Sequence, residues 1–337
     1  MKRVVMLIFT AILLIGCAAE APKSAGPEAA SVATESEEKT LERLEVAHRP
    51  DKLEYLSGET FDPTGLVINA FYSDGSVVEN VAWEAPETVI TSKMSSIAVT
   101  CMGKELRITF TVLVAGNQPQ YSVAQTPEIE NSPIKGQTFL WLGSSVTYGA
   151  ESEQESMADF FGKKYGVQTV KLALSGTSLA TYKPNSYAER LDKYIASAEK
   201  APNVDAFICQ LSTNDTNYTK ERGVVMPDFI TDSSAFDIAT TYGAIEYIIA
   251  RVRETWDCPI YFYTNPPTGN AAYGEMVEAL FRIAEKWDVT VIDLYTDASF
   301  NSIDDAARAL YMSDSIHPTK AGYRDWWLPK FEEALLP

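Results

Sequence analysis

The chain has 337 residues, 46% of them hydrophobic, and a formal charge of −18 from 46 acidic and 28 basic side chains. This length favours two domains, and the apolar content is sufficient for a core in each. The acidic balance argues against nucleic acid as a partner, because phosphate binding needs a basic face. No glycine-rich phosphate-binding loop follows a strand candidate, so we expect no nucleotide cofactor.

The N-terminus has the pattern of an export signal. Two basic residues precede an apolar run, residues 4–15, that is too short for a comfortable membrane span. Residues 14–17 (LIGC) resemble the bacterial lipoprotein signal. The resemblance implies that residues 1–17 are a signal peptide and that Cys17 becomes a lipidated N-terminus. The protein would then be exported and anchored in a membrane, at the bacterial cell surface or in the periplasm. Ordinary cleavage after Ala19 is the alternative.

Residues 18–40 are rich in Ala, Ser, Pro and Glu and have almost no large apolar side chains. Such a segment cannot bury enough surface to order itself, so we expect a disordered tether.

Three cysteines follow the tether, and an odd number cannot all pair. They are Cys101, Cys209 and Cys258. No spacing resembles a zinc site, which needs clustered Cys or His. We therefore expect buried free thiols and no metal.

Residues 41–115 have the pattern of a small all-β domain. Apolar and polar residues alternate over 106–114, which predicts the last strand. Asp74-Gly75 lies between two apolar dipeptides and predicts a hairpin. Several short strands at this length suggest a sandwich. Residues 53–76 resemble the bacterial immunoglobulin-like domains of cell-surface proteins, which implies a passive spacer or a glycan-contacting module.

Residues 116–135 contain three prolines and many polar side chains, and we expect a linker there. Over residues 136–337, strands and helices alternate. Apolar runs predict five strands, at 138–142, 167–174, 205–211, 259–264 and 289–294. Between them, apolar residues recur at helical spacing around Tyr187, Ile245 and Tyr273. This order predicts a three-layer α/β sandwich, with helices on both faces of a parallel five-stranded sheet.

Small and polar residues follow three successive strands. Ser144 and Ser145 come after the first strand, Gly176 after the second and Asn214-Asp215 after the third. In open parallel sheets the functional site lies beyond the carboxyl ends of the strands. These segments are therefore expected to converge.

A histidine near the C-terminus is the expected base. Of the two histidines, His48 has no catalytic pattern around it, whereas His317 follows Asp314 by three residues. Imidazole titrates near neutral pH, and an aspartate can orient its ring. Each feature also has an ordinary explanation, because serine, asparagine and aspartate often cap helices and turns.

Taken together, these residues resemble the SGNH (GDSL-type) hydrolase family. That family has a serine after the first strand, a glycine after the second, an asparagine after the third and Asp-x-x-His near the C-terminus. The resemblance covers about residues 136–337 and implies a flavodoxin-like sheet and ester hydrolysis without a cofactor. The implied site consists of the nucleophile Ser145, the pair Asp314 and His317, and an oxyanion hole from Ser145, Gly176 and Asn214.

The chain departs from the family pattern in two places. Ser144 stands where the family usually has aspartate, and Leu211-Ser212 replaces a glycine. Ser144 and Ser145 are chemically equivalent, so the residues alone leave open which one attacks; the family pattern favours Ser145. The order Ser, Asp, His also occurs in α/β-hydrolases, but Thr147 stands where their Gly-x-Ser-x-Gly turn has its second glycine.

The expected function is that of an exported serine esterase that removes acyl groups, acetyl above all, from an extracellular glycan through an acyl-enzyme. The family resemblance implies the esterase, whereas the glycan is inferred from location alone. Two alternatives stay open. One is a surface glycan-binding lipoprotein with an inactive hydrolase domain, and the other is an O-acyltransferase that uses the same serine.

Overall fold

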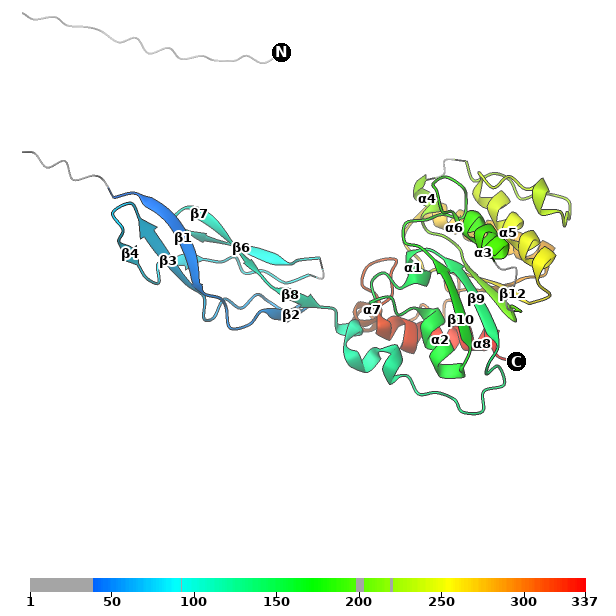
Figure 1. Ribbon diagram of the computed structural model, residues 1–337, viewed down its shortest axis with the longest axis horizontal. Helices are drawn as coiled ribbons and strands as arrows, with labels where there is room; N and C mark the ends of the chain where they lie inside the picture. The colour runs from blue at the N-terminus through cyan, green and yellow to red at the C-terminus, as the bar shows by residue number, and fades with distance from the viewer. Residues whose placement is uncertain (1–38, 92, 198–202, 219–220) are drawn as a thin grey trace, which may run out of the picture.

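Two domains follow one another in the computed structural model, an N-terminal β domain and a C-terminal α/β domain (Figure 1). The structure describes residues 39–91, 93–197, 203–218 and 221–337. The expected signal peptide, Cys17 and nearly all of the expected tether lie outside the described residues.

The N-terminal domain is built from short sheets around one core. Strands β1–β3–β4 and β5–β6–β7 form antiparallel sheets, and β2 and β8 form a parallel pair. The strands are β1 Leu41–His48, β2 Glu54–Leu56, β3 Val67–Tyr72, β4 Val77–Val78, β5 Trp83–Glu84, β6 Ser96–Cys101, β7 Lys104–Thr109 and β8 Thr111–Leu113. The predicted hairpin at Asp74-Gly75 is confirmed, since it joins β3 to β4.

The prediction of a single last strand over 106–114 is wrong. The chain changes sheets at Phe110, so that β7 pairs with β6 and β8 pairs with β2. The Phe110 N–H donates to the carbonyl of Ser95, whereas the Thr111 N–H donates to that of Leu53. The ring of Phe110 is buried in the core, so the apolar alternation continues through the change of partner and cannot reveal it.

Three short 3₁₀ turns connect the two domains: η1 Ala115–Asn117, η2 Pro119–Tyr121 and η3 Val123–Gln125. They lie against the α/β domain, near α7 and α2 (Figure 1). The Val123 N–H donates to the Glu155 carboxylate at 2.8 Å, and the Arg324 guanidinium donates to the carbonyl of Gln120 at 2.5 Å.

The α/β domain contains a fully parallel sheet in the order β10-β9-β11-β12-β13. All five predicted strands are confirmed: β9 Thr138–Gly143, β10 Gln168–Ala173, β11 Ala206–Gln210, β12 Ile260–Tyr263 and β13 Thr290–Ile292. The first strand, β9, lies between the second and the third. The connections therefore turn in opposite directions there, which is where doubly wound sheets bind their ligands.

Side chains on the two faces of this sheet form two cores, which confirms the three-layer architecture. Leu140 and Leu142 of β9 belong to the core of α3, α5 and α6, whereas Phe139 and Trp141 belong to that of α2 and α8. These helices are α2 Met157–Tyr165, α3 Tyr187–Ser197, α5 Thr241–Thr255, α6 Ala271–Trp287 and α8 Leu328–Leu335. Shorter segments are α1 Ser145–Tyr148, α4 Asp215–Tyr218, η4 Ser233–Ala235 and α7 Asp305–Tyr311.

A π-helical turn, η5 Gly322–Trp327, precedes α8 directly. It lies just before Pro329, which has no N–H to donate, so a wider turn at this point accommodates the missing hydrogen bond. The hydroxyl of Tyr323 in this turn donates to the carbonyl of Val146 at 2.6 Å and so connects the C-terminal segment to α1.

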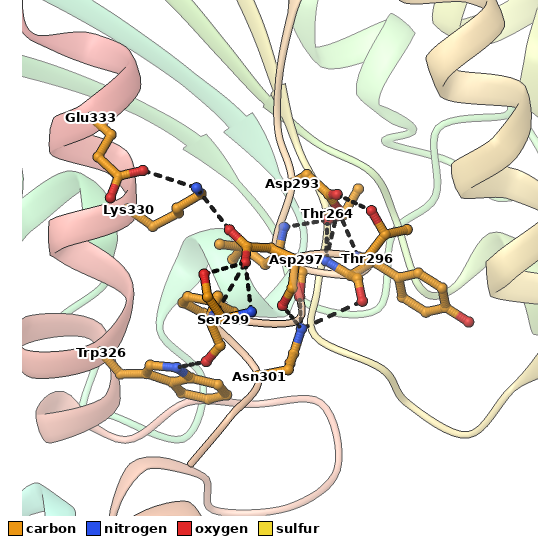
Figure 2. Close-up of polar contacts among 12 residues, drawn as sticks. Thr264, Asp293, Thr296, Asp297, Ser299, Asn301, Trp326, Lys330 and Glu333 are labelled. Atoms are coloured by element: carbon orange, nitrogen blue, oxygen red, sulfur yellow. Dashed lines mark hydrogen bonds and ion pairs between the residues drawn. The ribbon is translucent and has the colours of Figure 1, made fainter.

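A cluster of polar side chains stabilises the loop between β13 and α7 (Figure 2). The Asp297 carboxylate accepts hydrogen bonds from the N–H groups of Ser299 and Phe300 and forms an ion pair with Lys330 at 2.8 Å. The hydrogen bond from Lys330 holds the pKa of Asp297 well below its usual value. Because these acceptors are occupied by backbone groups and a lysine of α8, we interpret the cluster as structural.

Cys101 and Cys209 are buried free thiols, and Cys258 is a free thiol that is only partly buried. Among the described residues, no helix is long and apolar enough to cross a membrane. In the same part of the chain, no group of three His, Cys, Asp or Glu side chains is arranged to hold a metal ion.

Candidate active site

Ser145 lies just beyond the carboxyl end of β9, as the first residue of α1. The change from strand to helix requires Gly143, because a Cβ there would come within 1.6 Å of the Thr147 hydroxyl. The N–H of Ser145 is among the first in the helix, and these have no partner within it. The hydroxyl and the N–H of Ser145 thus both lie at the edge of the sheet where ligands bind.

Asp314 and His317 lie on a tight turn before the last helical segment. The Asp314 carboxylate accepts the N–H groups of Ile316 and His317, both at 2.8 Å. Its two oxygens also lie 2.9 and 3.0 Å from Nδ1 of His317. Burial would raise the pKa of Asp314, but the hydrogen bonds from the His317 ring and from these backbone groups lower it below its usual value. The carboxylate is therefore ionised and holds a proton on Nδ1.

The other nitrogen of the same ring, Nε2 of His317, lies 2.8 Å from Oγ of Ser145. The structure therefore brings Ser145, His317 and Asp314 into one chain of hydrogen bonds. A nucleophile, a base and a group that orients the base, each within hydrogen-bond reach, are the arrangement that serine hydrolases use.

Gly176 and Asn214 lie in the turns after β10 and β11, the two strands that flank β9. Gly176 has a φ of +76°, which favours glycine, and a Cβ there would meet nothing within 4 Å. The Asn214 amide donates to the carbonyl of Thr177 at 2.9 Å and so connects the two turns. An amide nitrogen carries two hydrogens, so a second donor stays on Asn214.

Residues 141–324 match the model of the GDSL-like Lipase/Acylhydrolase family. This match spans more than half of the chain and contains all the residues described above. The chain belongs to this family. It is accordingly an ester hydrolase. The N-terminal domain matches the model of the bacterial Ig-like domain (group 3) over residues 48–114. No curated protein matches the chain.

Several solved structures are similar to this chain over about three fifths of its length. One is a protein from Lactobacillus plantarum with 20% identity and a TM-score of 0.48. The similarity covers 60% of this chain and 97% of the Lactobacillus chain. Another is a member of the lipolytic protein G-D-S-L family from Veillonella parvula DSM 2008, with 15% identity and a TM-score of 0.45. The similarity covers 59% of this chain and 98% of the Veillonella chain. A third is an inhibitor-bound aryl esterase of M. smegmatis, with 15% identity and a TM-score of 0.42. The similarity covers 60% of this chain and 100% of the esterase chain.

Ser144, at the place where the GDSL family usually has aspartate, is completely buried. Its N–H and its hydroxyl both donate to Oε1 of Gln210, at 2.9 and 3.3 Å. The hydroxyl of Ser144 is therefore turned toward β11, whereas that of Ser145 meets His317. The sequence left open which of the two adjacent serines attacks, and their side chains point in different directions: only Ser145 points toward His317.

Asp215 supports the turn that contains Asn214. Its carboxylate accepts the N–H groups of Leu179 and Ala180 at 2.9 and 3.2 Å and the hydroxyl of Thr241 at 3.1 Å. Burial raises the pKa of Asp215 above its ordinary value in spite of these hydrogen bonds. Asp215 therefore has a structural role, because its carboxylate connects the turns after β10 and β11.

A buried polar relay, which sequence reasoning missed, connects the serine side of the site to the histidine side. Gln210 accepts hydrogen bonds from Ser144 and also donates to Oδ1 of Asn265 at 3.4 Å. Asn265 in turn donates to the carbonyl of Ile316, next to His317, at 2.9 Å. The signal in the sequence was a lone glutamine at the end of an apolar strand and an asparagine directly after another.

Arg190 of α3 is a second residue that the sequence did not reveal. Its guanidinium donates to the carbonyl of Gly143 at 2.6 Å and to the hydroxyl of Thr177 at 2.8 Å. Burial lowers the pKa of this guanidinium. Arg190 thus joins the end of β9 to the turn that contains Gly176.

Proposed function

We propose that Ser145, His317 and Asp314 are the catalytic triad of an esterase that works through an acyl-enzyme. The observation that carries the proposal is the 2.8 Å hydrogen bond between Oγ of Ser145 and Nε2 of His317. Nε2 takes the proton of Oγ as this oxygen attacks the ester carbonyl carbon, and gives it to the leaving alcohol as the C–O bond breaks. Asp314 orients the ring and stabilises the imidazolium that forms. Water, activated by the same nitrogen, then releases the acid and restores the serine.

The oxyanion hole in this proposal consists of the N–H groups of Ser145 and Gly176 and the side-chain amide of Asn214. What supports it is that these groups follow three adjacent strands, and that a hydrogen bond from Asn214 to Thr177 ties two of the turns together. Preorganised donors stabilise the negative charge that develops on the carbonyl oxygen, and one such donor contributes about 10²–10³ in rate.

The substrate we propose is an acyl ester, most of all an acetyl ester, on a glycan outside the cell. Two features of the chain support this choice: the lipoprotein-like N-terminus with Cys17, and the bacterial Ig-like domain before the hydrolase domain. In this proposal a lipid on Cys17 anchors the enzyme to a membrane, and the Ig-like domain holds the hydrolase away from it.

The first test is hydrolysis of p-nitrophenyl esters of increasing chain length, with acetylated xylan and acetylated peptidoglycan scored for acetate release. We expect the acetate esters to be cleaved fastest, and His317→Ala to remove the activity. A matched control is His48→Ala, which changes the other histidine of the chain and should keep full activity. Full activity in His317→Ala would refute the mechanism, and transfer of acetate to a sugar hydroxyl instead of water would reassign the enzyme as an acyltransferase.

The second test concerns the anchor. Cells that express the full chain are grown with a labelled fatty acid, and the protein is recovered from membranes. We expect label in the wild type and none in Cys17→Ser. Label that persists in the variant would exclude lipidation at this residue.

A further inference from the structure

The segment between the two domains lies outside both family matches, which cover residues 48–114 and 141–324. We call residues 115–125 the strap. The strap lies where two loops of the hydrolase domain meet. One is residues 149–156, between α1 and α2, which we call the serine loop; the other is residues 312–320, which we call the histidine loop.

A single side chain of the strap forms hydrogen bonds with both loops. The amide nitrogen of Asn117 donates to the carbonyl of Glu151, in the serine loop, at 2.6 Å. The amide oxygen of Asn117 accepts the N–H of Lys320, in the histidine loop, at 2.9 Å. Both partners are backbone groups, so Asn117 holds the paths of the two loops and not only their side chains.

The loops also contact each other at this place. Lys320 is buried, and its ammonium forms an ion pair with Glu153 at 2.6 Å. Ser313 donates to the Glu151 carboxylate at 3.3 Å. Asn117 therefore completes a junction between the two loops and does not merely cover one of them.

The neighbouring glycine shows how closely the strap approaches. A Cβ on Gly116 would lie 2.0 Å from the carbonyl of Leu310 and 2.2 Å from the hydroxyl of Thr319. Leu310 lies just before the histidine loop, and Thr319 lies within it, near its end. The backbone of the strap thus fits against this loop with no space for a side chain, which is typical of a close and specific contact.

We propose that the strap is part of the catalytic unit and that Asn117 is a positioning residue. It holds the histidine loop at the place where Nε2 of His317 reaches Oγ of Ser145. This inference rests on the proposed function. Displacement of reacting groups by about 1 Å can cost about 10²-fold in rate. The hydrogen bonds of Asn117 are only some of the contacts that hold the junction together. Removal of the Asn117 side chain should therefore cost part of that factor.

The test compares Asn117→Ala with Gln120→Ala in the full chain. Gln120 lies in the same strap and is exposed, and within the part of the chain that the structure describes its side chain forms a hydrogen bond only with Gln118, so it is a matched control. For Asn117→Ala we expect kcat on an aryl acetate to fall about tenfold, with KM and the melting temperature close to wild type. Gln120→Ala should keep the wild-type values.

Hydrogen exchange supplies a readout that needs no activity. Asn117→Ala should speed exchange of the Lys320 amide, whose acceptor it removes, and of amides in the serine loop. Asn117→Asp keeps an oxygen for Lys320 but not the donor for Glu151, so it should restore slow exchange at Lys320 alone.

Three results would overturn the inference: a kcat in Asn117→Ala equal to that of Gln120→Ala, a loss of activity that merely follows the unfolded fraction, or exchange rates that do not change. If the wild-type chain cleaved no ester, the proposed function would fail instead. The exchange rates would then decide by themselves whether Asn117 positions the loops.

Discussion

Gln210 accepts two hydrogen bonds from Ser144, one from its N–H at 2.9 Å and one from its hydroxyl at 3.3 Å. Ser144 is the residue directly before Ser145, and its side chain is completely buried. The end of β11 thus holds the first serine away from His317, and only the second serine reaches the base.

The two adjacent serines should therefore respond very differently to substitution. Ser145→Ala removes the nucleophile, and we expect kcat/KM on an aryl acetate to fall by about 10⁴-fold or more. Ser144→Ala removes a buried hydroxyl that interacts with Gln210 and Tyr187 and not with His317, and we expect kcat/KM to stay within about threefold of wild type. Covalent labelling with a fluorophosphonate provides a second readout, because Ser144→Ala should label and Ser145→Ala should not. Labelling of Ser144 in the Ser145→Ala chain would instead identify Ser144 as the nucleophile.

Asn214→Ala should lower kcat by about 10²–10³-fold with little change in KM, because its amide is proposed to stabilise the oxyanion only as charge develops. Gly176→Ala is the informative comparison. It keeps the backbone N–H, and its Cβ meets nothing within 4 Å, although φ is +76°. We expect a smaller loss of kcat than for Asn214→Ala and a loss of stability of about 1–2 kcal/mol. An Asn214→Ala enzyme with wild-type kcat would remove the side chain from the oxyanion hole.

The pH dependence should show a single acid limb. Hydrogen bonds from His317 and Ile316 hold the pKa of Asp314 below its usual value, so this carboxylate is ionised throughout the range in which an imidazole titrates. Because a depressed pKa keeps the charged form down to lower pH, its contribution to stability is lost only on acidification below the usual range. We expect log kcat/KM to fall toward low pH with a slope of one, because the general base then takes up a single proton. A slope of two between about pH 4 and 6 would show that Asp314 also titrates there.

Gln210→Met tests the buried relay. Methionine keeps the approximate shape but leaves the N–H of Ser144 and the hydroxyl of Thr147 without this acceptor, and each unsatisfied buried donor costs about 1–3 kcal/mol. We expect a loss of at least about 1 kcal/mol in the free energy of unfolding, measured in urea, together with a lower kcat. Gln168→Met, the same change at an exposed strand position, should stay within about 0.5 kcal/mol. Equal stability of the two variants would contradict a structural role for Gln210.

Much of the fold could be predicted because its signals are local. The five strands of the α/β domain were visible as apolar runs, and the segments after three of them predicted where the site would form. The failure in the N-terminal domain has an equally plain cause. Alternation reports which side of a strand is buried, and Phe110 stays buried while its backbone moves from one sheet to another.

The candidate site divides in the same way. Residue type and order pointed to Asp314, His317 and one of the serines 144 and 145, because acyl transfer needs a nucleophile, a base and a group that orients the base; the family resemblance favoured Ser145. The residues that hold these three gave weaker signals. Gln210, Asn265 and Arg190 are ordinary polar residues in the sequence, and their importance comes from partners that the sequence does not show.

What the sequence determined by itself, then, is the succession of strands and helices and the chemical groups that end them, since both follow from short-range patterns. What only the tertiary structure decided is direction and distance. It decided which of two serines meets the imidazole, and it decided that Asn117 lies beside Lys320, 203 positions further along the chain. Such contacts depend on how remote segments pack, and packing leaves no periodic trace in the residues that it brings together.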